Sequence, residues 1–173
     1  IVVGVLVTLF MVLVWARDSR KWMKWLSLVA LFAVVLQGVM GGLRVEQISR
    51  FLAIVHACFA QVFFVLTASF VLFTSRNWWE RQISGLDTSR LKPLSIMTVG
   101  FIYIQIVFGA VLRHTGSRLD AHLFFALLVA VHVFLLARKV KNDYSGNRAL
   151  ERPVLFLAGL LVLQLVLGLA SFL

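Results

Sequence analysis

The chain has 173 residues, of which 61% are hydrophobic and 14% are charged, with 17 basic residues against 7 acidic ones. Soluble domains average about 45–50% apolar and about 25% charged residues. This composition therefore excludes an ordinary soluble domain and indicates an integral membrane protein. The net charge of +10 does not indicate a nucleic-acid partner, because the basic residues lie between apolar runs, where they orient membrane helices.

Six apolar segments follow one another, at about 1–16, 22–44, 51–75, 93–113, 119–138 and 153–173. A membrane-spanning helix needs about 20 apolar residues, so the first segment is short and the other five are long enough. The sequence predicts an all-α integral membrane protein, a polytopic bundle with six helices in this chain. Pro93 and Pro153 are predicted to open the fourth and sixth helices, because the missing proline N–H costs little at a first helical position.

The chain begins at Ile1 without a methionine and ends at Leu173 inside an apolar run. We expect it to be an interior piece of a longer protein.

Basic residues are distributed unevenly among the five loops. The first, third and fifth loops hold 13 of the 17: Arg17, Arg20, Lys21 and Lys24; Arg76, Arg81, Arg90 and Lys92; Arg138, Lys139, Lys141, Arg148 and Arg152. The second and fourth loops hold only Arg44, Arg50, Arg113 and Arg118. By the positive-inside rule, the odd loops are predicted to be cytoplasmic and the even loops to face outward.

One pentapeptide pattern, Gln-x-Val-x-Gly, occurs in three of the predicted helices, at Gln37–Gly41, Gln105–Gly109 and Gln164–Gly168. The copies are 68 and 59 residues apart, so the predicted internal repeat contains about two membrane crossings. Glutamine and glycine four residues apart share a helix face, and the small residue allows close helix packing. A packing motif alone is therefore one interpretation.

A histidine follows each of the first two copies on the next predicted helix. His56 lies 19 residues after Gln37, and His122 lies 17 residues after Gln105. Ionisable residues inside a membrane usually mark a functional site, and a neutral imidazole is a common axial ligand of haem iron. A hydrogen bond between helices is the alternative, but two histidines at equivalent positions favour metal ligation. We therefore predict His56 and His122 as haem ligands.

An arginine also follows each of these two glycines, at the predicted outer surface. Arg44 lies three residues after Gly41, and Arg113 lies four residues after Gly109. A guanidinium there is suited to binding carboxylates such as haem propionates through two hydrogen bonds. The alternative is that both side chains extend to lipid headgroups.

The order of these segments resembles the heme A synthase family, membrane enzymes that convert heme O to heme A for cytochrome oxidase. Leu36–Val45 and Leu52–Gln61 resemble the third and fourth helices of that family. Gln105–Ser117 resembles the fifth helix with its following loop, and Leu163–Gly168 resembles the seventh. The resemblance implies a fold of eight helices in two pseudo-symmetric four-helix halves.

Residues 1–75 would then be the end of the first half, 76–92 a cytoplasmic linker and 93–173 the start of the second half. In the family, each half holds a haem between histidines from its second and fourth helices. His56 corresponds to the fourth-helix ligand and His122 to the sixth-helix ligand. Their partners and the family's catalytic acidic residue would lie outside this chain. The catalytic residues are thus unknown here, and this fragment is expected to be inactive alone.

The implied reaction is oxidation of a porphyrin methyl of heme O to the formyl of heme A, with a resident haem b that relays electrons. The alternatives are a non-catalytic, haem b-binding electron carrier and a cytochrome oxidase assembly factor. Expected partners are membrane lipid, haem, and heme O synthase or cytochrome oxidase assembly proteins. A homo-oligomer is also compatible with the sequence. The expected location is the bacterial plasma membrane or the mitochondrial inner membrane, with both histidines toward the outer face.

Overall fold

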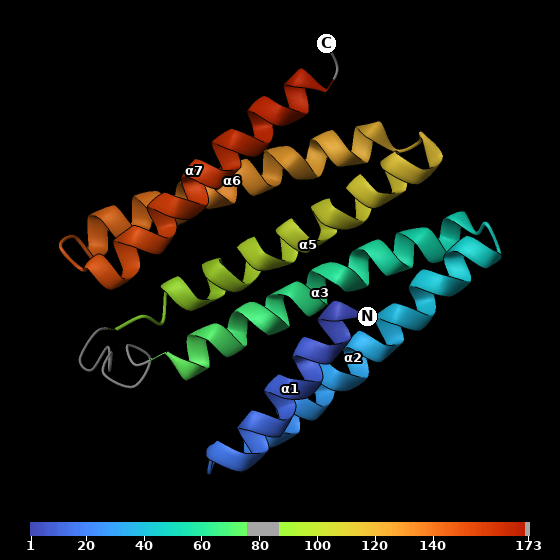
Figure 1. Ribbon diagram of the computed structural model, residues 1–173. Helices are drawn as coiled ribbons and strands as arrows, with labels where there is room; N and C mark the ends of the chain where they lie inside the picture. Colours follow the sequence, from blue (N-terminus) through green and yellow to red (C-terminus); the bar gives the residue numbers. More distant parts are fainter. Residues whose placement is uncertain (76–86, 172–173) are drawn as a thin grey trace. The chain divides into compact units, whose positions relative to one another are not determined.

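The computed structural model describes residues 1–75 and 87–171. These residues form α-helices joined by short turns, without any strand in the two ranges (Figure 1). The helices are α1 (Val2–Arg17), α2 (Lys21–Glu46), α3 (Arg50–Thr74), α5 (Leu91–Thr115), α6 (Leu119–Asp143) and α7 (Arg148–Ala170). The predicted all-α class is confirmed. Arg76 and Arg81 of the third predicted loop lie outside the described residues.

The helices α2, α3, α5, α6 and α7 are 23 to 26 residues long and apolar enough to cross a membrane, whereas α1 has 16 residues. Large apolar side chains are exposed along them, including Phe32, Phe64 and Phe156. Such surfaces are unfavourable in water and suited to lipid, where a helix also satisfies its own backbone hydrogen bonds. The chain is an integral membrane protein.

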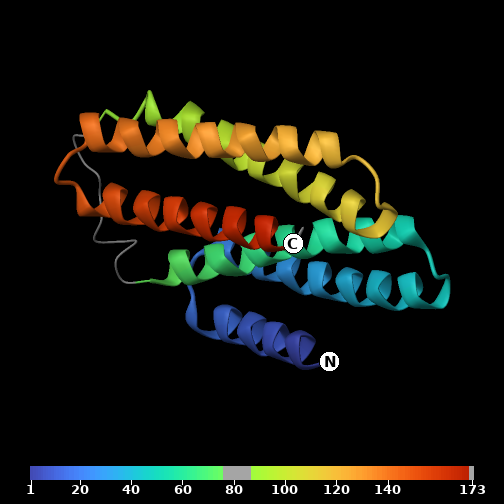
Figure 2. The ribbon, with the colours of Figure 1, turned by 90° about the horizontal axis from the view of Figure 1, so that it is seen from above.

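Two compact units divide the chain, Ile1–Ile83 and Ser84–Leu173. In the first unit α2 packs against both α1 and α3, and in the second α6 packs against both α5 and α7 (Figures 1 and 2). Within each unit, consecutive helices run in opposite directions, as the short turns between them require (Figures 1 and 2). The assignment of these units to two four-helix halves stays a prediction.

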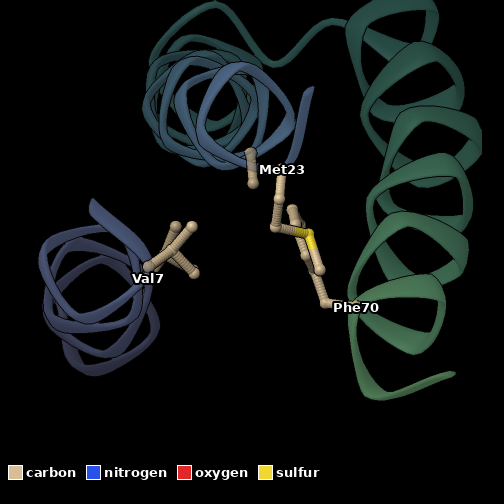
Figure 3. Packing of buried hydrophobic residues seen from close by; sticks show 5 residues of the cluster. Val7, Met23 and Phe70 are labelled. Carbon is tan, nitrogen blue, oxygen red and sulfur yellow. The ribbon is translucent and has the colours of Figure 1, made fainter. Parts of the chain in front are cut away.

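The core of the first unit joins all three of its helices. Val7 of α1, Met23 of α2 and Phe70 of α3 meet in one cluster (Figure 3). The ring of Phe70 also meets that of Phe10 edge to face, with centroids 4.8 Å apart. Ala30 of α2 is buried in the same cluster, and its small side chain allows close helix contact.

A hydrogen-bonded arginine ties the turn between α1 and α2 to the end of α3. The Nε of Arg20 donates to Asp18 Oδ1 at 2.8 Å, and its Nη1 donates to the carbonyl oxygen of Phe73 at 3.1 Å. Phe73 lies in the last turn of α3, where carbonyl groups lack a partner within the helix. The Arg20 side chain therefore caps α3 from another part of the chain.

The Asp18–Arg20 pair should make the stability of the first unit decrease in acid. Hydrogen bonds from Arg20 lower the pKa of Asp18 from 3.8 to about 2. A lowered folded-state pKa stabilises the fold above pH 4, and that stability is lost as the pH falls from about 4 to 2. We expect Arg20→Gln to destabilise the protein by about 1–2 kcal/mol at neutral pH, since the pair is partly buried. Thermal unfolding in detergent across this pH range measures the effect.

The control for this experiment is Arg17→Gln, because Arg17 is exposed and forms no hydrogen bond with another described side chain. Equal destabilisation by both substitutions would contradict the role of Arg20.

The second unit has a tie at the corresponding end. The hydroxyl of Tyr144 donates to the carbonyl oxygen of Asp87 at 2.6 Å, which joins the turn after α6 to the segment before α5. Tyr144 packs in a cluster with Leu91, Leu136 and Val140. Its phenol therefore satisfies a polar group while its ring fills apolar space.

Three predicted helix boundaries were wrong. Helix α7 begins at Arg148 rather than Pro153, because Asn147 Oδ1 accepts from the Ala149 N–H at 3.0 Å and caps the helix earlier. Pro93 is likewise the third residue of α5 rather than its first. Helix α6 continues to Asp143, so Arg138, Lys139 and Lys141 lie in its last turns and not in a loop. An ion pair between Lys139 and Asp143, at 2.7 Å, supports that extension.

The predicted orientation is testable at two exposed serines, Ser89 before α5 and Ser117 after it. We expect a membrane-impermeant maleimide to label Ser117→Cys in intact cells and Ser89→Cys only after permeabilisation, because the basic loops should be cytoplasmic. Ser145→Cys, in the turn after α6, should behave like Ser89→Cys. Labelling of all three from outside would overturn the orientation. The native Cys58 is buried and should stay unlabelled.

Candidate functional site

Both predicted histidines lie near the start of a helix that follows a tight turn. His56 is in the first two turns of α3, and His122 is in the first turn of α6. Left-handed backbone conformations close both turns, at Ile48 (φ 49°) and at Gly116 (φ 69°). Such tight reversals place the Gln-x-Val-x-Gly segment of the preceding helix beside the histidine.

The ring of each of these histidines lies close to the glycine of the preceding helix. A Cβ added to Gly41 would lie 3.2 Å from Cε1 of His56, and one added to Gly109 would lie 3.2 Å from Cε1 of His122. We call each of these a Gly–His contact. The prediction that these glycines face a neighbouring helix rather than lipid is confirmed. Gly168, in the third copy, has no such neighbour within 4 Å among the described residues.

The glutamine of each segment meets the same histidine, but in a different way. Gln37 Nε2 donates to the backbone carbonyl of His56 at 3.0 Å. Gln105 Nε2 lies 3.2 Å from Nδ1 and 3.3 Å from Nε2 of the His122 ring. We call these two the Gln–His pairs. These pairs were not predicted from the sequence, although the position of the glutamine on the same helix face as the glycine was a usable signal.

The buried polar atoms that lack a partner are concentrated at this site. Among the described residues, the buried side-chain nitrogen and oxygen atoms without a hydrogen bond are Gln37 Oε1, His56 Nδ1 and Gln105 Oε1. Leaving such an atom unpaired costs about 1–3 kcal/mol, so native proteins seldom do it without a reason. All three atoms belong to the Gln–His pairs, as expected of residues that complete a ligand site.

Of the two arginines, Arg44 is half-buried in the last turn of α2, the helix that also carries Gln37 and Gly41. Arg113 is exposed in the last turn of α5. Neither guanidinium forms a hydrogen bond or ion pair with another residue in the described ranges. Both remain able to bind an anionic group.

An aromatic cluster that was not predicted from the sequence lies one turn from the second Gln–His pair. The rings of Phe108 and Phe125 stack with centroids 5.2 Å apart, and Phe101 meets Phe125 at 6.3 Å. Phe108 follows Gln105 by three residues, and Phe125 follows His122 by three. A flat apolar surface therefore adjoins the histidine.

The contacts of His132 are those of a residue packed within its own unit, not of a free ligand. Its Nδ1 donates to the carbonyl of Leu128 at 2.9 Å, and its ring lies 4.5 Å from that of Phe101. Across residues 1–75 and 87–171, no three His, Cys, Asp or Glu side chains gather to hold a metal ion by themselves. The Gln–His pairs are thus the best candidate positions for a cofactor.

A protein-family model described as cytochrome oxidase assembly protein, COX15-CtaA, matches residues 1–121. The chain belongs to the COX15-CtaA family. The predicted membership of the heme A synthase family is thereby confirmed, and cytochrome oxidase assembly is the general role of that family. No curated protein and no solved structure matches the chain. The match includes the whole first Gln–His pair and ends at Ala121, one residue before His122.

Proposed function

We propose that this COX15-CtaA family member acts as a heme A synthase-like membrane oxidoreductase, which oxidises a porphyrin methyl of heme O to the formyl of heme A. Family membership supports a role in heme A formation for cytochrome oxidase. The observation that supports the proposal for these residues is the Gly–His contact. In both units, a Cβ added to the glycine would lie 3.2 Å from Cε1 of the histidine.

The residues at the two contacts suit haem. His56 and His122 are half-buried imidazoles in membrane helices, and each would supply one axial ligand to a different iron. Arg44 and Arg113 would bind propionate carboxylates at the same helix ends. The equivalent arrangement in two hairpins supports the predicted internal repeat and two separate haem sites.

The proposed reaction needs one site for the substrate haem and one site for a haem that relays electrons. Oxidation of the heme O methyl group to a formyl group, by two hydroxylations and loss of water from the resulting diol, takes up one net water and releases four protons and four electrons. An electron acceptor outside this chain would have to take up those electrons. Haem iron supplies the redox chemistry, and the second site would hold haem b as an electron relay. The chain's own contribution is to bind and orient both groups within a lipid-facing bundle, which suits a substrate that carries a farnesyl tail.

Haem composition tests this function. We expect the full-length protein, purified from membranes, to contain haem b together with heme O or heme A after acid extraction and chromatography. Haem b alone would favour a non-catalytic electron carrier. A protein without any haem absorption would favour an assembly factor in which both histidines only form hydrogen bonds.

A further inference from the structure

The two glutamines of the Gln–His pairs have no role in the proposed function so far. We infer that Gln37 and Gln105 are positioning residues, whose amide oxygens accept the Nδ1–H of His56 and His122 and leave Nε2 free to bind iron. This inference rests on the proposed haem ligation. Metal-binding histidines commonly donate their second ring N–H to a partner that fixes the tautomer and the ring orientation.

In the first unit, the free atoms are complementary. The amide nitrogen of Gln37 is already bonded to the backbone carbonyl of His56 at 3.0 Å, so only its Oε1 remains available. That oxygen and His56 Nδ1 are both buried and both without a partner in the described residues. A protonated Nδ1 can only donate and an amide oxygen can only accept. Each atom therefore supplies what the other lacks.

In the second unit, the tautomer decides which amide atom faces the ring. Gln105 Nε2, a donor, lies 3.2 Å from His122 Nδ1 and 3.3 Å from His122 Nε2. Iron needs the lone pair of Nε2, so ligation requires the ring proton on Nδ1, and a protonated Nδ1 cannot accept from an amide N–H. Turning the amide by 180° exchanges its nitrogen and oxygen with little change in shape. The buried, unpartnered Oε1 then accepts from Nδ1, as ligation requires.

The Gly–His contact complements this hydrogen bond. Because even a Cβ added to the glycine would lie 3.2 Å from Cε1 of the ring, the ring has little room to move toward the preceding helix. The glycine thus limits the position of the ring, and the glutamine sets where its proton lies. Substitution of Gln105 gives the clearer test, because a substitution of Gln37 would also remove the hydrogen bond from Gln37 to the backbone of the adjacent helix.

Two substitutions with opposite effects test the inference in the full-length protein. Gln105→Leu removes the acceptor, so the midpoint potential of the His122-bound haem should rise, and haem affinity should fall by about 10–100-fold. Gln105→Glu supplies a stronger, charged acceptor, so the same potential should fall. Redox titration followed by optical and electron paramagnetic resonance spectra measures both potentials. The spectrum of His122→Ala identifies which haem belongs to His122.

The matched control is Gln61→Leu, which makes the same change at an exposed glutamine of α3 that forms no hydrogen bond in the described ranges. Both potentials should stay unchanged in it. Shifts of the same sign in the two Gln105 variants, or none, would overturn the inference while leaving haem ligation intact. If Gln105→Leu holds no haem, the sign of the Gln105→Glu shift decides. Absence of haem from the unsubstituted protein would remove the proposed function and this inference together.

Discussion

Replacing His56 or His122 with alanine is expected to remove one haem signal from the full-length protein and to leave the other. Each histidine contacts a glycine within its own unit and would ligate its own iron, so loss of one imidazole should not reach the second site. The double variant should lose both signals. Optical and electron paramagnetic resonance spectra, with haem quantified per protein, provide the measurement.

The control is His132→Ala, because His132 is hydrogen-bonded to Leu128 of its own helix. That variant should keep both haem signals. If His56→Ala or His122→Ala abolished all bound haem in a protein that still folds, the two-site proposal would be wrong. A single site shared by the two histidines would then be the better interpretation.

The second large effect is expected from filling the space at a Gly–His contact. In Gly41→Leu or Gly109→Leu, the Cβ alone would lie 3.2 Å from the imidazole, and the remaining side-chain carbons would need still more room. Overpacking of this kind costs about 1–3 kcal/mol. We expect lower thermal stability together with loss of the haem signal assigned to the same unit.

Neighbouring glycines provide matched controls. Added Cβ atoms at Gly42 of α2 and Gly100 of α5 meet nothing within 4 Å in the described structure. Gly42→Leu and Gly100→Leu should therefore retain both stability and haem. If they were as damaging as Gly41→Leu and Gly109→Leu, helix propensity or lipid contact would explain the effect, and the Gly–His contact would not.

Much of the helix pattern is readable from the sequence, because the length of an apolar run and the charge of its flanks are local properties. The exact ends of the helices are harder to predict from the sequence. At α7 the proline at position 153 suggested a helix start, but the cap formed by Asn147 and Ala149 starts the helix five residues earlier. A hydrogen bond accepted by a single side chain thus outweighed the positional preference of proline.

At the candidate site, the spacing of glutamine, glycine and histidine was enough to predict that Gly41 and Gly109 face another helix. The contacts of the glutamines were not predictable, because they depend on turn length and side-chain rotamers. His56 lies deeper in its helix than His122 does, and Gln37 reaches a backbone carbonyl where Gln105 reaches a ring. Haem ligation itself stays a prediction.

The ties formed by Arg20 and Tyr144 have a consequence for how a large flat molecule could enter. Within each unit, the tie lies at the helix ends remote from the Gln–His pair. The tight turns at Ile48 and Gly116 join the same helices beside the Gln–His pairs, so each helix pair is held at both ends. A flat molecule would therefore have to reach His56 or His122 across the outer surface of the helix pair, because the two helices are held together at both ends.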